Sequence, residues 1–232
     1  MDSILEGIKQ AFILLMHGNR QVVQVALLSL AVSGIATLFS LLVGIPLGAA
    51  LALNQFPGRR PIVSLINTGM GSPPVVVGLL VSIILWRSGP LGMLQLMYTP
   101  SAKVVAQFII AFPVVAGFTL ASVQQLDPKL RLQIISLGAS RLQMVWLLLR
   151  EARLPLLAAV MAGFGAVISE VGASMMVGGN ITGQTRVMTT AIVAEVSRGD
   201  FALAIAFSVI LMIMVFLVNL ILTLIQQRGK PR

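Results

Sequence analysis

The chain has 232 residues, of which 57% are hydrophobic and 10% are charged, and its formal net charge is +9. A soluble domain cannot bury so much apolar surface, so the mean hydropathy of +0.99 predicts a membrane protein. The lack of cysteine excludes disulfide, iron–sulfur and thiolate-zinc sites, and His17 is too isolated for a metal site. We therefore expect this chain to bind no metal and no cofactor.

The first segment, residues 1–21, is not predicted to be a cleavable signal because it carries Asp2 and Glu6 and its apolar positions are spaced. These apolar positions fall on one face of a helix, which predicts an amphipathic helix at the membrane interface. The residues of that face are Ile4, Leu5, Ile8, Phe12 and Leu15.

Five later apolar runs are each long enough to cross a bilayer, since a spanning helix needs about 20 residues. They cover residues 22–53, 62–86, 104–123, 156–177 and 201–225. With neither an internal repeat nor a soluble region between them, they predict an all-α polytopic membrane protein of one domain, residues 1–232.

Two of the runs contain prolines that affect the expected helices. Pro46 predicts a kink in the first run, which is too long for one straight span. Pro73 and Pro74 predict irregular backbone in the second run, and such backbone is tolerated at membrane depth only against protein or a water-lined cavity. Residues 187–196 are apolar but too short to cross, so a re-entrant or surface helix is expected there.

The positive charge is distributed between the runs and does not form one patch, so no nucleic-acid partner is expected. Ten of the 16 basic residues fall in segments that one orientation places on the same side of the membrane. The positive-inside rule then predicts an external N-terminus, a cytoplasmic C-terminus and a cytoplasmic segment at residues 124–155.

This cytoplasmic segment is predicted to be helical and basic. Asp127 is a suitable N-cap and Pro128 a suitable first helical residue. One stripe is expected to hold Leu130, Ile134, Leu137 and Arg141, with Gly138 leaving a bare patch beside it. From the pattern alone the segment is either a helix lying on the lipid surface or a docking site for another protein.

A resemblance to a known family favours docking. The segment resembles the cytoplasmic loop of ABC importer permeases, in which a short coupling helix docks into a groove of an ATPase subunit. Leu132, Gln133 and Ile134 stand where that family has Glu-Ala-Ala, and the spacing from Gly138 to Pro155 is about one helical turn longer than usual. The resemblance implies that the ATPase contacts are made by Leu137, Gly138, Ala139, Ser140 and Arg141.

A second stretch, residues 169–186, resembles the G-E-F-G-A…G-N-I-x-G-x-T region of the oxyanion permeases for molybdate, tungstate and sulfate, and looks most like the tungstate subgroup. This resemblance implies the type I ABC importer permease fold and a prokaryotic cytoplasmic membrane. It also implies a homodimer with two ATPase subunits and an external oxyanion-binding protein. The chain has no phosphate-binding loop motif, so we expect a non-catalytic subunit whose partner uses the ATP.

Glu170 is the one acidic residue deep in an apolar run, and an ionisable group there is a functional hypothesis by default. A proton-coupled secondary transporter is one alternative, although the runs supply no His, Lys or Asp partner. A structural role, hydrogen-bonded to backbone or a hydroxyl, is the second. Lining an anion path is the least favourable, because a carboxylate repels a dianion.

Neutral hydroxyls, amides and backbone N–H groups can stabilise a passing dianion without trapping it. Small residues also serve for tight helix packing, and methionines for soft packing as well as for an apolar gate. The external residues either contact a binding protein, screen the anion or form a solvated loop. Path and gate candidates are Asn67, Thr68, Ser72, Ser169, Glu170, Ser174, Met175 and Met176, and external-mouth candidates are Asn180, Thr182, Gln184 and Arg186. A scaffold subunit without transport remains a third class.

Overall fold

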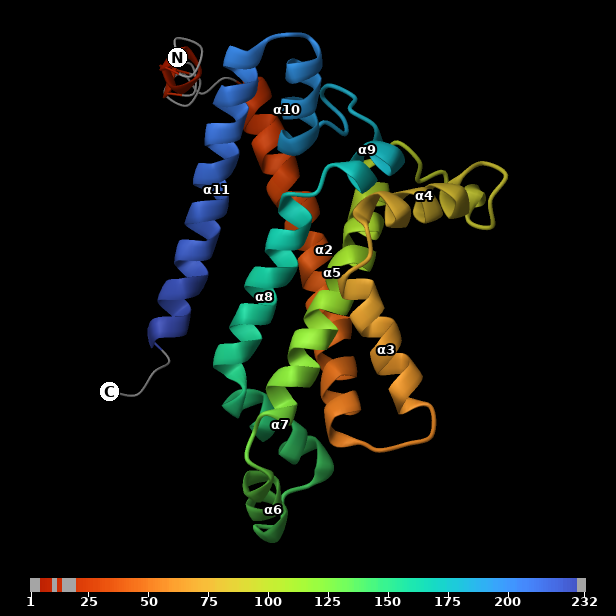
Figure 1. Ribbon diagram of the computed structural model, residues 1–232, viewed down its shortest axis with the longest axis vertical. Coiled ribbons are helices and arrows are strands. Elements are labelled where there is room, and N and C mark those ends of the chain that lie inside the picture. Colours follow the sequence, from red (N-terminus) through yellow and green to blue (C-terminus); the bar gives the residue numbers. More distant parts are fainter. Residues whose placement is uncertain (1–4, 10–11, 14–19, 229–232) are drawn as a thin grey trace.

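A computed structural model of the protein describes residues 5–9, 12–13 and 20–228, which contain helices and no strand. Three helices are long and apolar enough to cross a membrane alone: α2 (Arg20–Leu53), α5 (Pro100–Gln124) and α11 (Phe201–Arg228). They agree in position with the first, third and fifth predicted runs (Figure 1). The all-α prediction is confirmed, and α2 continues as one helix through Pro46.

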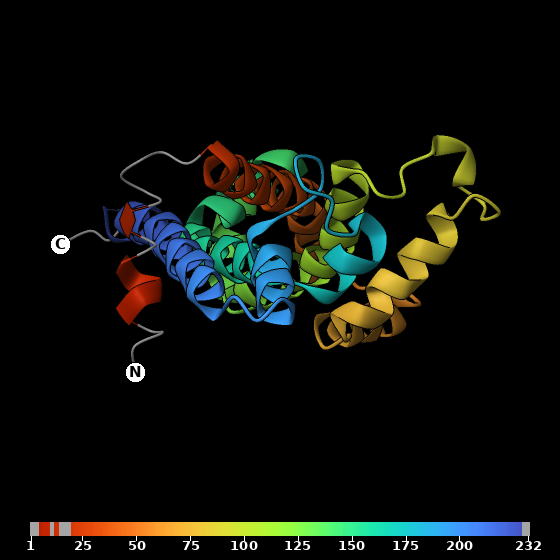
Figure 2. The same ribbon diagram turned by 90° about the horizontal axis from the view of Figure 1, so that it is seen from above.

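The second predicted run is broken in the structure. It forms α3 (Arg59–Met70) and α4 (Pro74–Leu85), which meet at an angle of 106°. The two prolines at the break supply no backbone N–H, and Pro74 occupies the first turn of α4, where that loss is tolerated. As a result, α4 projects sideways from the bundle, as both views show (Figures 1 and 2).

The fourth predicted run is also broken, at a site that contains no proline. It forms α8 (Arg153–Ile168) and α9 (Gly172–Gly178), and α8 is itself bent by 72° from the preceding α7 (Arg141–Glu151). The three residues between α8 and α9 include Glu170, which therefore lies at the break and not within a continuous helix.

The remaining short helices are η1 (Gly92–Leu94), α6 (Pro128–Ser136) and α10 (Met188–Ser197). The predicted helix at residues 187–196 corresponds to α10, which packs against α11 and α2. The Met188 backbone N–H donates to Ser29 Oγ on α2 at 2.8 Å.

The predicted interfacial helix is described only in part. Residues 5–9 and 12–13 are helical, and Leu5, Ile8 and Phe12 are exposed, as an interfacial face requires. Ile4 and Leu15 lie outside the described residues.

The turn before α3 lies at the same end of the molecule as α6 and α7, and the loop before α10 lies toward the opposite end (Figure 1). The loop around η1 projects sideways at the outer end of α4. At the first end, Arg59 Nε donates to Leu51 O at 2.7 Å and Arg131 Nη1 donates to Leu53 O at 3.2 Å. Two arginines thus satisfy carbonyls at the C-terminus of α2, where the helix dipole favours positive charge.

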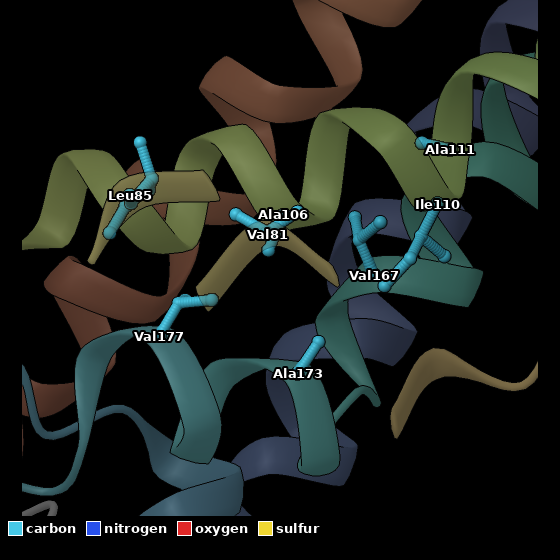
Figure 3. Packing of buried hydrophobic residues seen from close by; sticks show 9 residues of the cluster. Val81, Leu85, Ala106, Ile110, Ala111, Val167, Ala173 and Val177 are labelled. Carbon is cyan, nitrogen blue, oxygen red and sulfur yellow. The ribbon is translucent and has the colours of Figure 1, made fainter. Parts of the chain in front are cut away.

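Side chains from α4, α5, α8 and α9 form a buried core beside the break between α8 and α9 (Figure 3). Ala106 and Ala173 are fully buried there, and such small residues allow helix backbones to approach closely. The larger members include Val81, Ile110 and Val177. This core attaches α4 to α5 and α9 even though the axis of α4 leaves the bundle.

The longest helix, α2, packs closely on α5 through a glycine. A Cβ added at Gly48 would lie 2.5 Å from Ala116 O and 2.7 Å from Thr119 Cβ, so only glycine fits without a shift. Gly34, on the same helix, has no atom within 4 Å of the same position.

We predict that Gly48→Ala lowers the free energy of unfolding by about 1–3 kcal/mol, the usual cost of overpacking. Gly34→Ala is the matched control and should leave stability unchanged or raise it, because alanine favours the helix and meets no neighbour there. Thermal unfolding of both variants in nanodiscs measures the difference. Equal melting temperatures would contradict the close α2–α5 contact.

Candidate functional site

The carboxylate of Glu170 caps the helix that follows it. Its Oε1 accepts from the Ala173 backbone N–H at 2.6 Å, and its Oε2 accepts from the Ser174 N–H at 3.0 Å. The Glu170 backbone carbonyl accepts from Thr189 Oγ1 on α10 at 3.0 Å. Glu170 is 5% exposed, so these bonds occupy a buried carboxylate and support the structural alternative for it.

Two polar side chains of α5 satisfy the backbone around the same break. Gln107 Nε2 donates to Val167 O, near the end of α8, at 3.1 Å, and it lies 3.5 Å from Ser174 Oγ. Lys103 Nζ donates to Gly179 O, at the end of α9, at 3.1 Å. Because a bilayer offers no water to orphaned carbonyls, these bonds permit the helix break.

Lys103 also supplies the charge partner that the sequence did not reveal. It is fully buried and interacts electrostatically with Glu170, although no direct ion pair joins them among the described residues. The statement that the apolar runs supply Glu170 with no Lys partner is therefore corrected, since α5 begins at Pro100 and includes Lys103. A Cβ at Gly178 would overlap the Lys103 stem, so the glycine leaves room for it.

The hydroxyl candidates on α3 and at the end of α8, Thr68 and Ser169, are exposed on the surface of the chain. Thr68 Oγ1 donates to Ser64 O at 2.9 Å, and Ser169 Oγ donates to Gly165 O at 2.8 Å. Ser72 Oγ likewise donates to Thr68 O at 3.0 Å. Each hydroxyl hydrogen is thus held by a carbonyl four residues earlier in the chain, so a passing anion would have to displace that bond.

The other path candidates differ in exposure. Asn67 is exposed on α3, whereas Ser174 is fully buried inside the chain. Met175 is 36% exposed, and Met176 lies against α4, where its Sδ would be 3.3 Å from a Cβ at Gly78. The structure therefore brings Ser174 and Glu170 together but leaves Asn67 and Ser174 in different surroundings. Their role in a path stays a prediction.

The predicted external-mouth residues belong to a loop that is folded by its own hydrogen bonds. The N–H groups of Gln184, Thr185 and Arg186 all donate to Ile181 O, at 3.1, 2.9 and 3.0 Å. Asn180 Oδ1 accepts from Thr190 Oγ1 on α10 at 3.0 Å. Thr182 and Gln184 are exposed, whereas the Arg186 side chain is buried beside Glu195, with Nη1 to Oε1 at 3.5 Å. The last contact was not expected.

The predicted coupling residues occupy the turn between α6 and α7. Gly138 has φ +82°, and its N–H donates to Ile135 O at 2.9 Å, so it closes α6 in a conformation that favours glycine. Ser140 then caps α7 by accepting from the Gln143 N–H at 3.4 Å. Leu137, Gly138, Ser140 and Arg141 are exposed, and Ala139 is half-buried.

The single amphipathic stripe predicted for this segment was wrong. Ile134 is 8% exposed and packs with Met144 and Leu148 on α7, whereas Leu137 is 87% exposed. The chain folds back at Gly138, because α6 ends after nine residues. The result is a helical hairpin with Leu137 at its tip.

Comparison with known proteins places these features in a family. Residues 44–232 match the family described as binding-protein-dependent transport system inner membrane component. The chain belongs to this family. It is therefore a multi-pass membrane protein of a binding-protein-dependent transport system.

The chain is also similar to individual members of the family. It is 39% identical to the tungstate uptake system permease protein TupB of Peptoclostridium acidaminophilum, over 98% of this chain and 100% of that protein. It is 40% identical to a probable anion ABC transporter permease of Haloferax volcanii, over 85% and 87%. The molybdenum permease ModB of Escherichia coli is 30% identical, over 72% and 77%.

Solved structures share the fold of this permease. The methionine ABC transporter MetNI, in inward-facing conformations, superposes with a TM-score of 0.75 at 18% identity, over 90% of this chain and 96% of that one. This likeness confirms the type I ABC importer permease fold.

The residues that sequence reasoning missed are Lys103 and Gln107. They are four positions apart and so lie on one face of α5, a spacing that marks a polar stripe on an otherwise apolar helix. That spacing was the available signal. Lys103 stands one residue before the predicted run 104–123 and so falls outside every predicted span.

We predict that Glu170→Ala lowers the free energy of unfolding by about 2–4 kcal/mol, because two buried charge-assisted bonds to backbone N–H groups are lost. Glu170→Gln retains one acceptor oxygen and should cost less, with uptake per folded molecule largely preserved. Thermal unfolding and proteoliposome uptake at several pH values measure both effects. A Glu170→Gln protein of normal stability, but without uptake or its pH dependence, would contradict the structural role.

Proposed function

We propose that this chain is the permease subunit of an ATP-driven importer for a tetrahedral oxyanion, and that the anion is tungstate. The observation that carries the proposal is the full-length similarity to a tungstate permease, against lower identity and coverage for a molybdenum permease. The residue pattern of the α8–α9 region and its external loop supports the same class. In this proposal the N-terminus is outside and the C-terminus is in the cytoplasm.

The α6–α7 hairpin is proposed as the docking site for an ATPase subunit, and the permease itself is proposed to be non-catalytic. Leu137 and Leu142 are 87% and 81% exposed at the end of the molecule that carries the arginine caps of α2. Large apolar side chains of this exposure at a water-facing tip are typical of an interaction site. ATP hydrolysis is assigned to that partner, since the permease has no phosphate-binding loop motif.

A second copy of the chain is proposed as the other wall of the path. Asn67, Thr68 and Ser169 are exposed on the protomer, so they cannot enclose an anion without an opposing surface. Two copies would then dock two ATPase subunits through two hairpins, and an external oxyanion-binding protein would deliver the anion. Closure of the ATPases would move the hairpins together and open the path outward, and hydrolysis would reset it inward.

We predict that Leu137→Asp reduces the affinity of the permease for its ATPase by at least about tenfold, since an exposed apolar anchor at an interface is worth about 2 kcal/mol or more. Stability should not change, because Leu137 contacts solvent. Met93→Asp is the control: Met93 is 85% exposed in η1, which lies between α4 and α5 and outside the α6–α7 hairpin. Co-purification of the ATPase measures the loss, and equal recovery with both variants would contradict the docking assignment.

The substrate is tested by reconstituting the permease with its ATPase and its binding protein in proteoliposomes. We expect ATP-dependent accumulation of tungsten when tungstate is supplied at limiting concentration, with molybdate and sulfate competing only in large excess. Calorimetric titration of the three anions into the binding protein should give the same order. Preferred accumulation of sulfate or molybdate would refute the tungstate assignment but not the oxyanion class.

A further inference from the structure

A second polar site lies at the end of the molecule opposite the α6–α7 hairpin. A cavity of about 300 Å³ separates the first turns of α2 from the loop that precedes α10. Arg20 and Gln24 contribute to its wall from α2, and Thr182, Gln184 and Arg186 contribute from the loop. A tetrahedral oxyanion has five heavy atoms, so a cavity of this size holds one together with several water molecules.

Arg186 is the residue that points to a ligand. Its residue exposure is 5%, and its Nε has no hydrogen-bond partner among the described residues although it is buried. Burial of a charged group with incomplete hydrogen bonding is costly, so an acceptor that reached the guanidinium from the cavity would lower that cost. At the other edge of the guanidinium, Arg186 Nη1 lies 3.5 Å from Glu195 Oε1, which is a long distance for an ion pair.

The charge around the cavity is positive. Glu195 is shared between Arg186 and Arg198, whose Nη1 lies closer, at 2.8 Å from Glu195 Oε1. One carboxylate thus serves two guanidinium groups, and Arg20 adds a third on the cavity wall. Among the described residues that line the cavity there is no Asp or Glu. The N-terminal turn of α2 adds the positive end of a helix dipole.

The wall is held in place before any ligand arrives. Gln24 Nε2 donates to Gly183 O at 3.2 Å, which joins α2 to the loop across the cavity. Ile181 O gathers the N–H groups of Gln184 and Arg186 and so fixes the loop from within. A preformed site of this kind loses little conformational entropy on binding.

We propose that this cavity binds a tetrahedral oxyanion, with the Arg186 guanidinium as the principal donor and Arg20 as the second. Guanidinium groups recognise oxyanions through paired N–H donors, and the neighbouring amides and hydroxyl add neutral donors. The cavity then holds the anion on its way from the binding protein into the path. That transport role rests on the proposed function, whereas the binding itself does not.

Equilibrium dialysis of sodium tungstate against the full-length permease in nanodiscs of neutral lipid tests the proposal, with bound tungsten counted by mass spectrometry. We expect one saturable site per chain. Arg186→Gln and Arg20→Gln should each weaken binding at least about tenfold, because each removes a charged donor. Arg20 is exposed, so Arg20→Gln keeps the test valid if Arg186→Gln does not fold.

Arg198→Gln is the matched control, because Arg198 contacts the same carboxylate as Arg186 but does not line the cavity. It should change the dissociation constant by less than about threefold. Equal losses with Arg198→Gln and Arg186→Gln, or no saturable binding to the wild type, would overturn the site. Uptake by the assembled transporter separates the two proposals: uptake without cavity binding refutes only the site, and cavity binding without uptake of any oxyanion refutes only the proposed function.

Discussion

The need to satisfy backbone groups at the α8–α9 break is the constraint on which the rest of this structure depends. A helix interrupted inside a bilayer leaves N–H and C=O groups that no water can reach. The Glu170 carboxylate accepts hydrogen bonds from two N–H groups in the first turn of α9. Gln107 and Lys103 of α5 donate to carbonyls near the end of α8 and at the end of α9. Thr189 ties the same point to α10. Glu170 and these three side chains together hold α8, α9, α5 and α10 at one point, and Lys103 brings a positive charge near the Glu170 carboxylate.

The outline of the fold could be predicted from sequence because the bilayer itself enforces it. Runs of about 20 apolar residues have few alternatives to a spanning helix, so the long helices follow from composition. The break at Pro73 and Pro74 could also be predicted, since a proline disturbs the helix at its own position. The break at Glu170 could not be predicted, because it is stabilised by side chains of α5 that lie more than sixty positions away.

The candidate site was predictable to a lesser degree, and for a related reason. A motif indicates which residues matter but not which side chains face one another. Ser174 and Thr68 are similar hydroxyl residues in the sequence, yet one is fully buried and the other is exposed. Leu137 and Ile134 share a helical stripe only if the helix continues, and Gly138 ends it. Arg186 was placed in the external loop, but its burial beside Glu195 depends on α10, which no local pattern reveals.

The two ends of the permease are connected by a single helix. With 34 residues, α2 extends over about 51 Å at 1.5 Å per residue. Its first turns form a wall of the cavity beside the loop before α10, and its last carbonyl accepts from Arg131 of the α6–α7 hairpin. Close packing at Gly48 holds α2 against α5, which carries Lys103 and Gln107 to the helix break. The α6–α7 hairpin, the cavity beside Arg20 and the α8–α9 break are thus linked by direct contacts of α2 and α5.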